Sequence, residues 1–184
     1  GIKHITISVF ENIRLFKSIL DNKKFPKIKI DFLIEKKSLS TAGGLKIIKN
    51  LPKEFFAMNG DVITNLNFKN FYNFHKKYNS DLTLCSKTLY SKIEYGVVEN
   101  DINLKLLKFK EKPKIRYNVN LGIYIIKKDV IKLIPHSKSF GFDKLIKKIP
   151  RKKISVYNSD CKWFDIGREK DLFNAHNFIL KNKK

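Results

Sequence analysis

The sequence predicts an α/β protein with a mixed, mainly parallel sheet. In its first half, segments in which apolar residues alternate, such as Ile5, Ile7 and Val9, precede segments with apolar residues three or four positions apart. Repeated β-α units of this kind build parallel sheets whose two faces are covered by helices. In the second half most apolar segments alternate, which adds antiparallel strands to the predicted sheet.

The first half contains successive β-α units. Its expected strands are residues 5–9, 28–34 and 55–58. Its expected helices are residues 11–20, residues 41–48 opened by a Ser/Thr cap, and residues 68–78 with Phe71, Phe74 and Tyr78 facing inward.

The second half begins with four expected strands, at residues 82–86, 95–99, 104–109 and 121–126. Short helices follow at 130–134 and 142–148, and further strands at 154–157 and 162–164. The pattern ends in an amphipathic helix over 169–180 that uses Leu172, Phe173, His176 and Ile179.

Length and composition favour one soluble domain. The 184 residues are 42% apolar, and no Pro/Gly/Ser-rich linker interrupts them. The apolar run from Leu121 to Ile126 is far shorter than the ~20 residues of a membrane span, and the start of the chain lacks a signal-peptide pattern. We therefore expect a cytoplasmic protein without membrane contact, in which Cys85 and Cys161 are unpaired thiols.

The net charge of +22 raises the question of a polyanionic partner. Only four of the 39 basic residues are arginines, the residue that grips phosphates and base edges by bidentate contacts. The lysines are also scattered along the chain, with several isolated pairs rather than one block. We therefore expect no nucleic-acid partner, and a field that speeds the arrival of small phosphorylated anions.

Two carboxylates stand where strands of an open α/β sheet would end. Asp61 follows the apolar run Phe55–Met58 in an Asn-Gly-Asp sequence, and Asp165 lies in Trp-Phe-Asp-Ile-Gly. Open sheets hold ligands at such strand ends, and Mg²⁺ takes a few carboxylate oxygens together with water and phosphate oxygens. The pair therefore predicts a magnesium site, although each aspartate also fits an ordinary turn or helix cap.

Six motifs follow one another along the chain: Glu35 with Leu39–Gly44, Asn59–Asp61, Glu94–Val98, Glu111–Pro113, Asn120–Tyr124 and Trp163–Gly167. In this order they resemble the sugar-1-phosphate nucleotidylyltransferase family. The resemblance covers residues 1–184 and implies a Rossmann-like domain. It also implies that an NTP and a sugar 1-phosphate are converted with Mg²⁺ into an NDP-sugar and pyrophosphate, as in surface polysaccharide biosynthesis.

The resemblance also implies roles for individual residues. Asp61 and Asp165 would hold Mg²⁺ and, with Lys112, form the catalytic set. The sugar 1-phosphate would contact Gly96, Glu111, Lys112, Asn120 and Gly122. Pro113 is expected to keep Lys112 out of a helical conformation, so that Glu111 and Lys112 face a pocket. Read from the residues alone, Glu111 and Lys112 also fit a surface ion pair, and each glycine fits a bulge.

The nucleotide would lie against Leu39, Thr41, Ala42, Gly43, Asn59 and Gly60. Thr41, Ala42 and Gly43 resemble guanylyl- and some uridylyltransferases, which favours GTP. Ser40 stands where the family has a glycine, so a special backbone angle at this position is an open question. Ser40 or Thr41 also fits a plain helix cap.

One family element is absent from this sequence. The glycine-rich loop that cradles the NTP phosphates has no counterpart, and the resemblance starts at the family's second strand. We therefore expect an N-terminally truncated domain, inactive or nearly so alone, which associates as a homo-oligomer or with a complementing N-terminal segment. The alternative function is a noncatalytic sugar-nucleotide-binding or regulatory subunit.

Overall fold

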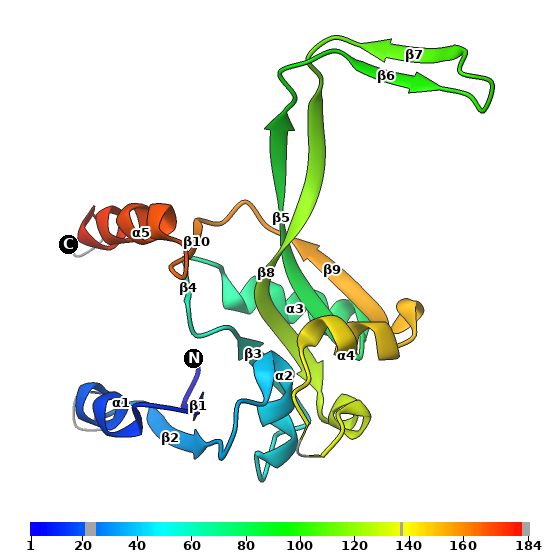
Figure 1. Cartoon of the computed structure of the whole chain (residues 1–184). Coiled ribbons are helices and arrows are strands. Elements are labelled where there is room, and N and C mark those ends of the chain that lie inside the picture. The colour runs from blue at the N-terminus through cyan, green and yellow to red at the C-terminus, as the bar shows by residue number, and fades with distance from the viewer. Residues whose placement is uncertain (21–24, 137, 182–184) are drawn as a thin grey trace. The chain divides into compact units, whose positions relative to one another are not determined.

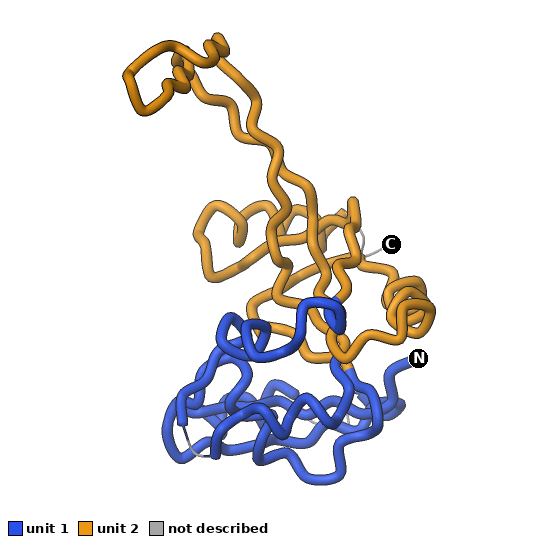
Figure 2. The backbone as a smooth tube through the Cα atoms, turned by 90° about the vertical axis from the view of Figure 1, so that its right-hand side faces the viewer, with its two compact units in different colours: residues 1–55, 126–154 blue, residues 56–125, 155–184 orange. Residues whose placement is uncertain are grey.

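The computed structural model describes residues 1–20, 25–136 and 138–181, and forms a mixed α/β fold (Figure 1). Two compact units divide the chain (Figure 2). Unit 1 consists of Gly1–Phe55 and Ile126–Ile154, and unit 2 of Phe56–Ile125 and Ser155–Lys184. Each unit is built from two separate stretches, so no linker in the sequence marks the division.

Unit 1 begins with a β-α-β unit. Strands β1 (His4–Val9) and β2 (Lys29–Ile34) pair in parallel, with Ile5 opposite Ile30 and Val9 opposite Ile34, and helix α1 (Ile13–Ile19) lies between them in the sequence. The other elements of unit 1 are α2 (Ser40–Gly43), the 3-10 helices η1 (Gly44–Ile47), η2 (Lys128–Leu133) and η3 (Arg151–Lys153), and α4 (Phe142–Lys148).

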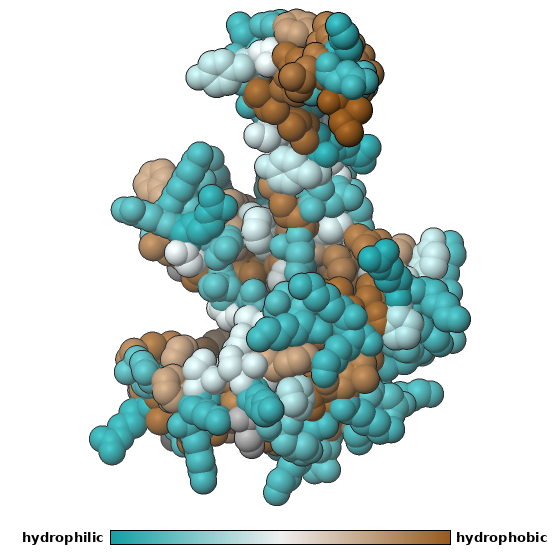
Figure 3. Space-filling model, turned by 45° about the vertical axis from the view of Figure 1, so that its right-hand side comes forward, coloured by the Kyte–Doolittle hydropathy of each residue, from teal (hydrophilic) through white to brown (hydrophobic). Residues whose placement is uncertain are grey.

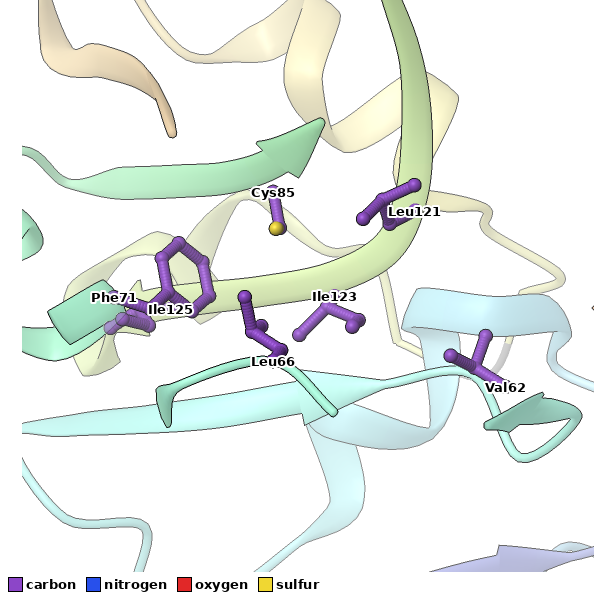
Figure 4. Close-up of a cluster of buried hydrophobic side chains, with 7 residues drawn as sticks. All are labelled: Val62, Leu66, Phe71, Cys85, Leu121, Ile123 and Ile125. Carbon is purple, nitrogen blue, oxygen red and sulfur yellow. The ribbon is translucent and has the colours of Figure 1, made fainter. Parts of the chain in front are cut away.

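A four-stranded sheet forms the centre of unit 2. Its order is β3 (Glu54–Met58), β8 (Lys114–Lys127), β5 (Leu82–Lys92) and β9 (Ile154–Asn158). Helix α3 (Phe68–Tyr78) contributes Phe71 to the core beside the sheet. The core cluster comprises Val62, Leu66, Phe71, Cys85, Leu121, Ile123 and Ile125 (Figure 4).

Unit 2 also contains two antiparallel strand pairs and a helix. Strand β4 (Val62–Thr64) pairs with β10 (Trp163–Asp165), and β10 leads into α5 (Glu169–Lys181). Strand β6 (Val97–Asn100) pairs with β7 (Leu106–Lys110) in a hairpin between β5 and β8. Trp163 donates its indole N–H to the carbonyl oxygen of Leu121 at 2.9 Å, which ties β10 to the middle of β8.

Most predicted elements are confirmed, with changed lengths. The helix over 68–78 and the helix over 142–148 have the predicted bounds, and the parallel β1–β2 pair agrees with the predicted first half. Strands β5 and β8 are much longer than predicted, because they pair beyond their buried portions into exposed polar sequence. Strand β4 was not predicted, since three residues are too few for an alternation pattern.

Three details of the predicted elements are wrong. The helix over 41–48 is a short α-turn followed by a 3-10 helix, and its N-cap position is Leu39 without a side-chain cap. Tyr78 does not face inward, since it is 56% exposed at the end of α3. In α5 the side chains of Leu172, Phe173, His176 and Ile179 are exposed, and Ala175 is the buried residue.

The face of α5 that packs inward carries smaller apolar signals than the face predicted. Ala175 is fully buried, and the ring of Phe178 lies 5.4 Å from that of Phe164 on β10. Residues 175 and 178 are three positions apart, so they share one side of the helix. The prediction chose the neighbouring side of the helix, with Leu172 and Phe173, because apolar residues occur on both sides of this segment.

Both cysteines are unpaired, as expected. Cys85 is completely buried in the core cluster, and burial raises the pKa of its thiol from 9.0 to about 12. The thiol therefore stays protonated at neutral pH and behaves as a small apolar side chain. Among the described residues, no helix is both long and apolar enough to cross a membrane.

Candidate active site

The two aspartates predicted to bind magnesium lie side by side in unit 2. Val62 of β4 is paired with Asp165 of β10, and the amide of Ile166 donates to the carbonyl oxygen of Asp61 at 2.9 Å. The antiparallel β4–β10 pair therefore brings together two residues that are far apart in the sequence. The loop after β3 supplies one carboxylate and the end of β10 supplies the other.

Gly167 marks the point at which the two carboxylates converge. A Cβ atom built on this glycine would lie 3.2 Å from Oδ1 of Asp165 and 3.5 Å from Oδ2 of Asp61. Because both distances are measured from the same point, the two oxygens are less than about 7 Å apart. One Mg²⁺ at ~2.1 Å from each oxygen needs them within about 4 Å of each other.

The donor set fits a magnesium ion that completes its shell with phosphate oxygens. In the described part of the chain, no cluster of three or more His, Cys, Asp or Glu side chains has metal-binding geometry. Mg²⁺ commonly takes only one or two protein carboxylates beside water and substrate phosphates. Oδ1 of Asp165 also accepts the amide of Gly167 at 3.2 Å, so the turn that the sequence allowed is present as well.

A second group of predicted site residues lies beside the end of strand β3. The amide of Asn59 donates to the carbonyl oxygen of Gly122 on β8 at 2.9 Å. Gly122 has a φ of 69°, and a Cβ atom there would come within 2.7 Å of Nδ2 of Asn59. Position 122 therefore accepts glycine both for its backbone conformation and for this close approach.

The side chain of Asn120 is engaged within its own strand. Its Oδ1 accepts the amide of Gly122 at 3.1 Å, and its Nδ2 donates to the hydroxyl of Tyr124 at 2.6 Å. The amide NH₂ group has a second hydrogen that these contacts do not use. Because Trp163 binds the carbonyl of Leu121, the Asn120–Gly122 segment and the two aspartates belong to one connected group of strands.

Gly96, Glu111 and Lys112 lie together at the base of the β6–β7 hairpin. A Cβ atom on Gly96 would lie 2.8 Å from the ring of Phe109 and 3.1 Å from Oε2 of Glu111. Nζ of Lys112 is 3.9 Å from Oε1 of Glu111, and both side chains are more than half exposed. The surface ion pair that the residues alone suggested is therefore present.

The structure does not bring this hairpin group next to Asn120. The strand β8 runs without interruption from Lys114 to Lys127. At ~3.3 Å per residue, six residues of strand put roughly 20 Å between Lys114 and Asn120. Lys112 itself has a φ of 43°, in the left-handed region, so it is outside the right-handed helical conformation that the following proline was expected to exclude.

The residues predicted to line the nucleobase are divided between the units. Asn59 and Gly60 belong to unit 2, while Leu39, Thr41, Ala42 and Gly43 belong to unit 1. In unit 1 the carbonyl of Leu39 accepts the amide of Phe140 at 2.9 Å, and the amide of Ala42 donates to the carbonyl of Phe140 at 3.0 Å. Leu39 and Ala42 are buried, so Thr41 is the exposed side chain of the four.

The backbone angle at Ser40, left open by the sequence, is defined in the structure. Its φ is 62°, so the serine adopts the left-handed conformation that glycine adopts most easily. The hydroxyl of Thr41 does not cap the helix but accepts the amide of Phe142 at 3.2 Å. The turn at Leu39–Gly43 is therefore held by backbone and side-chain bonds to residues 140–142.

Sequence reasoning gave no role to Glu35, which the structure places under this turn. Glu35 is 8% exposed, and its carboxylate accepts the amide of Leu39 at 2.8 Å and the hydroxyl of Ser8 at 2.5 Å. A Cβ atom on Gly44 would lie 2.6 Å from Oε1 of Glu35. In the sequence, this arrangement was signalled by an acidic residue followed at short spacing by a serine suited to a helix cap and by two consecutive glycines.

Comparison with known proteins adds the decisive observation. Residues 1–182 match the family model described as "Nucleotidyl transferase". The chain belongs to the nucleotidyl transferase family. Its curated relatives in this family include mannose-1-phosphate guanyltransferase from Saccharomyces cerevisiae, 32% identical over 95% of this chain and 51% of the relative. The UTP–glucose-1-phosphate uridylyltransferase of Synechocystis is 32% identical over 80% of this chain and 41% of the relative.

The chain spans about half the length of these curated nucleotidyl transferases. This chain covers a larger share of a solved structure with a similar fold. HddC from Yersinia pseudotuberculosis superimposes with a TM-score of 0.73 and 25% identity, over 97% of this chain and 80% of that one. The Rossmann-like α/β fold of the family is therefore shown for this chain.

Proposed function

We propose that the protein takes part in nucleotidyl transfer from an NTP, with GTP as the donor, to a sugar 1-phosphate. The products are an NDP-sugar and pyrophosphate. The observation that carries the proposal is the convergence of Asp61 and Asp165 on Gly167 within a member of the nucleotidyl transferase family.

The chemistry needs positive charge at this place. When a sugar phosphate attacks the α-phosphorus of an NTP, two anions are brought together and negative charge grows on the departing pyrophosphate. When Mg²⁺ is bound, it offsets this charge. Asp61 and Asp165 would hold and orient the ion, and Lys112 would meet the sugar phosphate if the hairpin base reaches it.

The names of relatives support guanine as the base and mannose as a candidate sugar. Several curated relatives at 28–32% identity are named mannose-1-phosphate guanyltransferases. The Thr-Ala-Gly sequence at positions 41–43 favours the same base. The Synechocystis relative of equal identity uses UTP by its name, so donor and sugar are both part of the proposal.

Nucleotidyl transfer also requires a loop that binds the NTP phosphates. No glycine-rich Gly-Gly-x-Gly-Thr-Arg-Leu sequence occurs in these 184 residues. We propose that this chain acts as the C-terminal part of the enzyme and that an N-terminal segment supplies the loop. The test is therefore made on the full gene product, whose intact mass and upstream sequence establish whether it carries the loop.

The decisive experiment measures magnesium-dependent pyrophosphate release by the full gene product, with each NTP and a panel of sugar 1-phosphates. Loss of an outer partner of a metal ligand already costs 10–100-fold. We therefore expect Asp61→Asn and Asp165→Asn each to lower kcat/KM by at least about 100-fold. Asp160→Asn, an exposed aspartate in the same unit, is the matched control and should keep full activity.

A noncatalytic sugar-nucleotide-binding or regulatory subunit is the second candidate, favoured by the missing glycine-rich loop. Isothermal titration calorimetry separates the two functions. Binding of an NDP-sugar by the full gene product, without pyrophosphate release from any NTP, would refute the enzyme and support the subunit.

A further inference from the structure

A line of polar side chains, called the polar ladder here, crosses three strands of the central sheet in unit 2. It consists of Ser86 and Thr88 on β5, Asn118 on β8 and Asn158 on β9, with β5 in the middle. Nδ2 of Asn158 donates to Oγ1 of Thr88 at 3.0 Å, and Oγ1 of Thr88 donates to Oδ1 of Asn118 at 2.9 Å. The polar ladder therefore passes through one hydroxyl group from β9 to β8.

The hydrogen bonds of the polar ladder run in one direction. A threonine hydroxyl has a single hydrogen, so the bond that Thr88 donates holds the carbonyl oxygen of Asn118 toward β5. At the other end Oγ of Ser86, which is only 2% exposed, donates to Oδ1 of Asn158 at 3.3 Å. Both amide groups are thereby fixed in one orientation. In the described part of the chain, no group accepts a hydrogen bond from Nδ2 of Asn118, which is the free end of the ladder.

This free end lies on the same face of β8 as Asn120, the asparagine predicted to contact sugar. Asn118 and Asn120 are two positions apart on a continuous strand, so their side chains project from one face, roughly 7 Å apart. Val119 and Leu121 project from the opposite face, where they pack in the core cluster. In the space-filling view, hydrophilic side chains cover most of the visible part of the β5–β8 ribbon below the hairpin (Figure 3).

Strand β8 also places the polar ladder relative to the metal-binding aspartates that were predicted. Gly122 contacts Asn59, which precedes Asp61 by two positions. From Gly122 through Asn120 to Asn118, each step along the strand leads roughly 7 Å farther from that contact. A sugar ring that lies over Asn120, with its 1-phosphate toward Asp61, therefore extends toward Asn118. The C4 hydroxyl lies across the ring from C1 and is at that end.

The predicted sugar contacts leave this place open. Glu111 and Lys112 were expected beside the sugar, but β8 separates the base of the hairpin from Asn120 by roughly 20 Å. Asn118 is exposed and lies between them on the strand. The oxygen of a sugar hydroxyl can accept a hydrogen bond from a neutral amide NH₂ group. An amide that is already held in position also loses little conformational entropy when a ligand binds.

We propose that Asn118 is a specificity-determining residue, whose Nδ2 group donates a hydrogen bond to the C4 hydroxyl of the sugar. Thr88 and Asn158 are positioning residues that act through Asn118. The inference rests on the proposed function, because it takes the sugar to lie at Asn120 with its phosphate toward Asp61. It adds which hydroxyl the site distinguishes. A sugar that lacks this hydroxyl leaves the amide without its acceptor.

The test measures binding to the full gene product by isothermal titration calorimetry. The ligands are GDP-mannose and UDP-glucose, each compared with its 4-deoxy analogue and with the bare nucleoside diphosphate. For the NDP-sugar that the wild type binds more tightly, we expect Asn118→Ala to weaken binding about 5- to 10-fold, the contribution of one hydrogen bond between neutral groups. Binding of the bare diphosphate should not change, because the diphosphate does not reach the polar ladder.

Two changes at Thr88 test the positioning role. Thr88→Val keeps the shape of the side chain but removes the hydroxyl, so the amide of Asn118 is free to rotate. We expect it to weaken binding of the NDP-sugar about 3-fold. Thr88→Ser retains the hydroxyl and should bind as the wild type does. Circular dichroism and the denaturation midpoint establish that each variant is folded.

The matched control is Asn73→Ala, which should leave all affinities unchanged. Asn73 is an exposed asparagine of α3, the helix that packs on the core face of the sheet. The 4-deoxy analogue should bind equally well to the wild type and to Asn118→Ala, since the proposed hydrogen bond is absent from both complexes.

Four results would each overturn the proposal. They are unchanged NDP-sugar binding by Asn118→Ala, an equal loss of affinity for the bare diphosphate, an equal loss for the 4-deoxy analogue, and a wild type that binds neither NDP-sugar more tightly than its diphosphate. The proposed function fails differently. The expected binding pattern without pyrophosphate release from any NTP would refute catalysis and leave the role of Asn118 standing.

Discussion

Ser40 adopts a conformation that its side chain disfavours. A φ of 62° costs a residue with a Cβ atom roughly 1–2 kcal/mol, and glycine adopts it freely. The turn tolerates serine because the bonds between Leu39, Ala42 and Phe140 determine its backbone. The sequence alone therefore did not determine the backbone angle at position 40. The hydrogen bonds to the neighbouring segment determine it.

Replacing this serine should stabilise the protein. We expect Ser40→Gly to raise the free energy of unfolding by about 0.5–1 kcal/mol, since relief of strain exceeds the entropy gained by the unfolded chain. Chemical denaturation measures the effect. Ser38→Gly, two residues earlier and without a positive φ, should lower stability slightly. A lower midpoint for Ser40→Gly would contradict the strain argument.

Gly122 represents the opposite case, a glycine that the site requires. Its φ of 69° and the 2.7 Å approach of Nδ2 of Asn59 both oppose a side chain. We expect Gly122→Ala to cost about 2–4 kcal/mol of unfolding free energy. Gly60→Ala, for which a Cβ atom meets nothing within 4 Å, should change it by less than about 0.5 kcal/mol.

A double variant separates the two causes of this cost. Asn59→Ala removes the side chain that an alanine at position 122 would contact, but it leaves the positive φ in place. The combined Asn59→Ala and Gly122→Ala protein should therefore recover part of the loss in a denaturation cycle. Full additivity of the two single changes would show that the close approach is unimportant.

At the scale of elements, helix α3 has a defined beginning. Oδ1 of Asn67 accepts the amide of Asn70 at 3.0 Å and satisfies a donor that the first turn leaves unpaired. We expect Asn67→Ala to lower unfolding free energy by about 1 kcal/mol in thermal or chemical denaturation. Asn73→Ala, exposed in the middle of the same helix, should be neutral or slightly stabilising.

The predictable elements are those with strong local patterns. Helix α3 and strand β3 have enough apolar residues at one spacing to be recognised from the sequence, and their bounds are close to those predicted. The β4–β10 pair joins residues 99 or more positions apart, so no local pattern reveals it. The aspartates were predicted by type and position, while their meeting required this long-range pairing.

The faces of elements were harder to predict than their positions. In α5 Leu172 and Phe173 are exposed, whereas Ala175 is buried and Phe178 packs against Phe164 of β10. The hairpin group of Gly96, Glu111 and Lys112 was predicted beside Asn120, a juxtaposition that rested on the family resemblance. The extended pairing of β5 with β8 separates them in this structure.

At the scale of the whole molecule, the charge of +22 should act on encounter rates. Long-range fields raise association rates of opposite charges by 10-fold or more at low salt. For the full gene product we expect the association rate of GTP, measured by stopped flow, to fall about 10-fold between 50 and 500 mM KCl. Guanosine, which lacks phosphates, is the control ligand, and an equal salt dependence for it would exclude steering.

The chain crosses between its two compact units three times, and β3 and β8 each contribute residues to both. No single cut in the gene can therefore excise either unit intact. A recombination event that exchanged one stretch would leave a strand without its own partner residues. The two units are therefore expected to be inherited together as one piece.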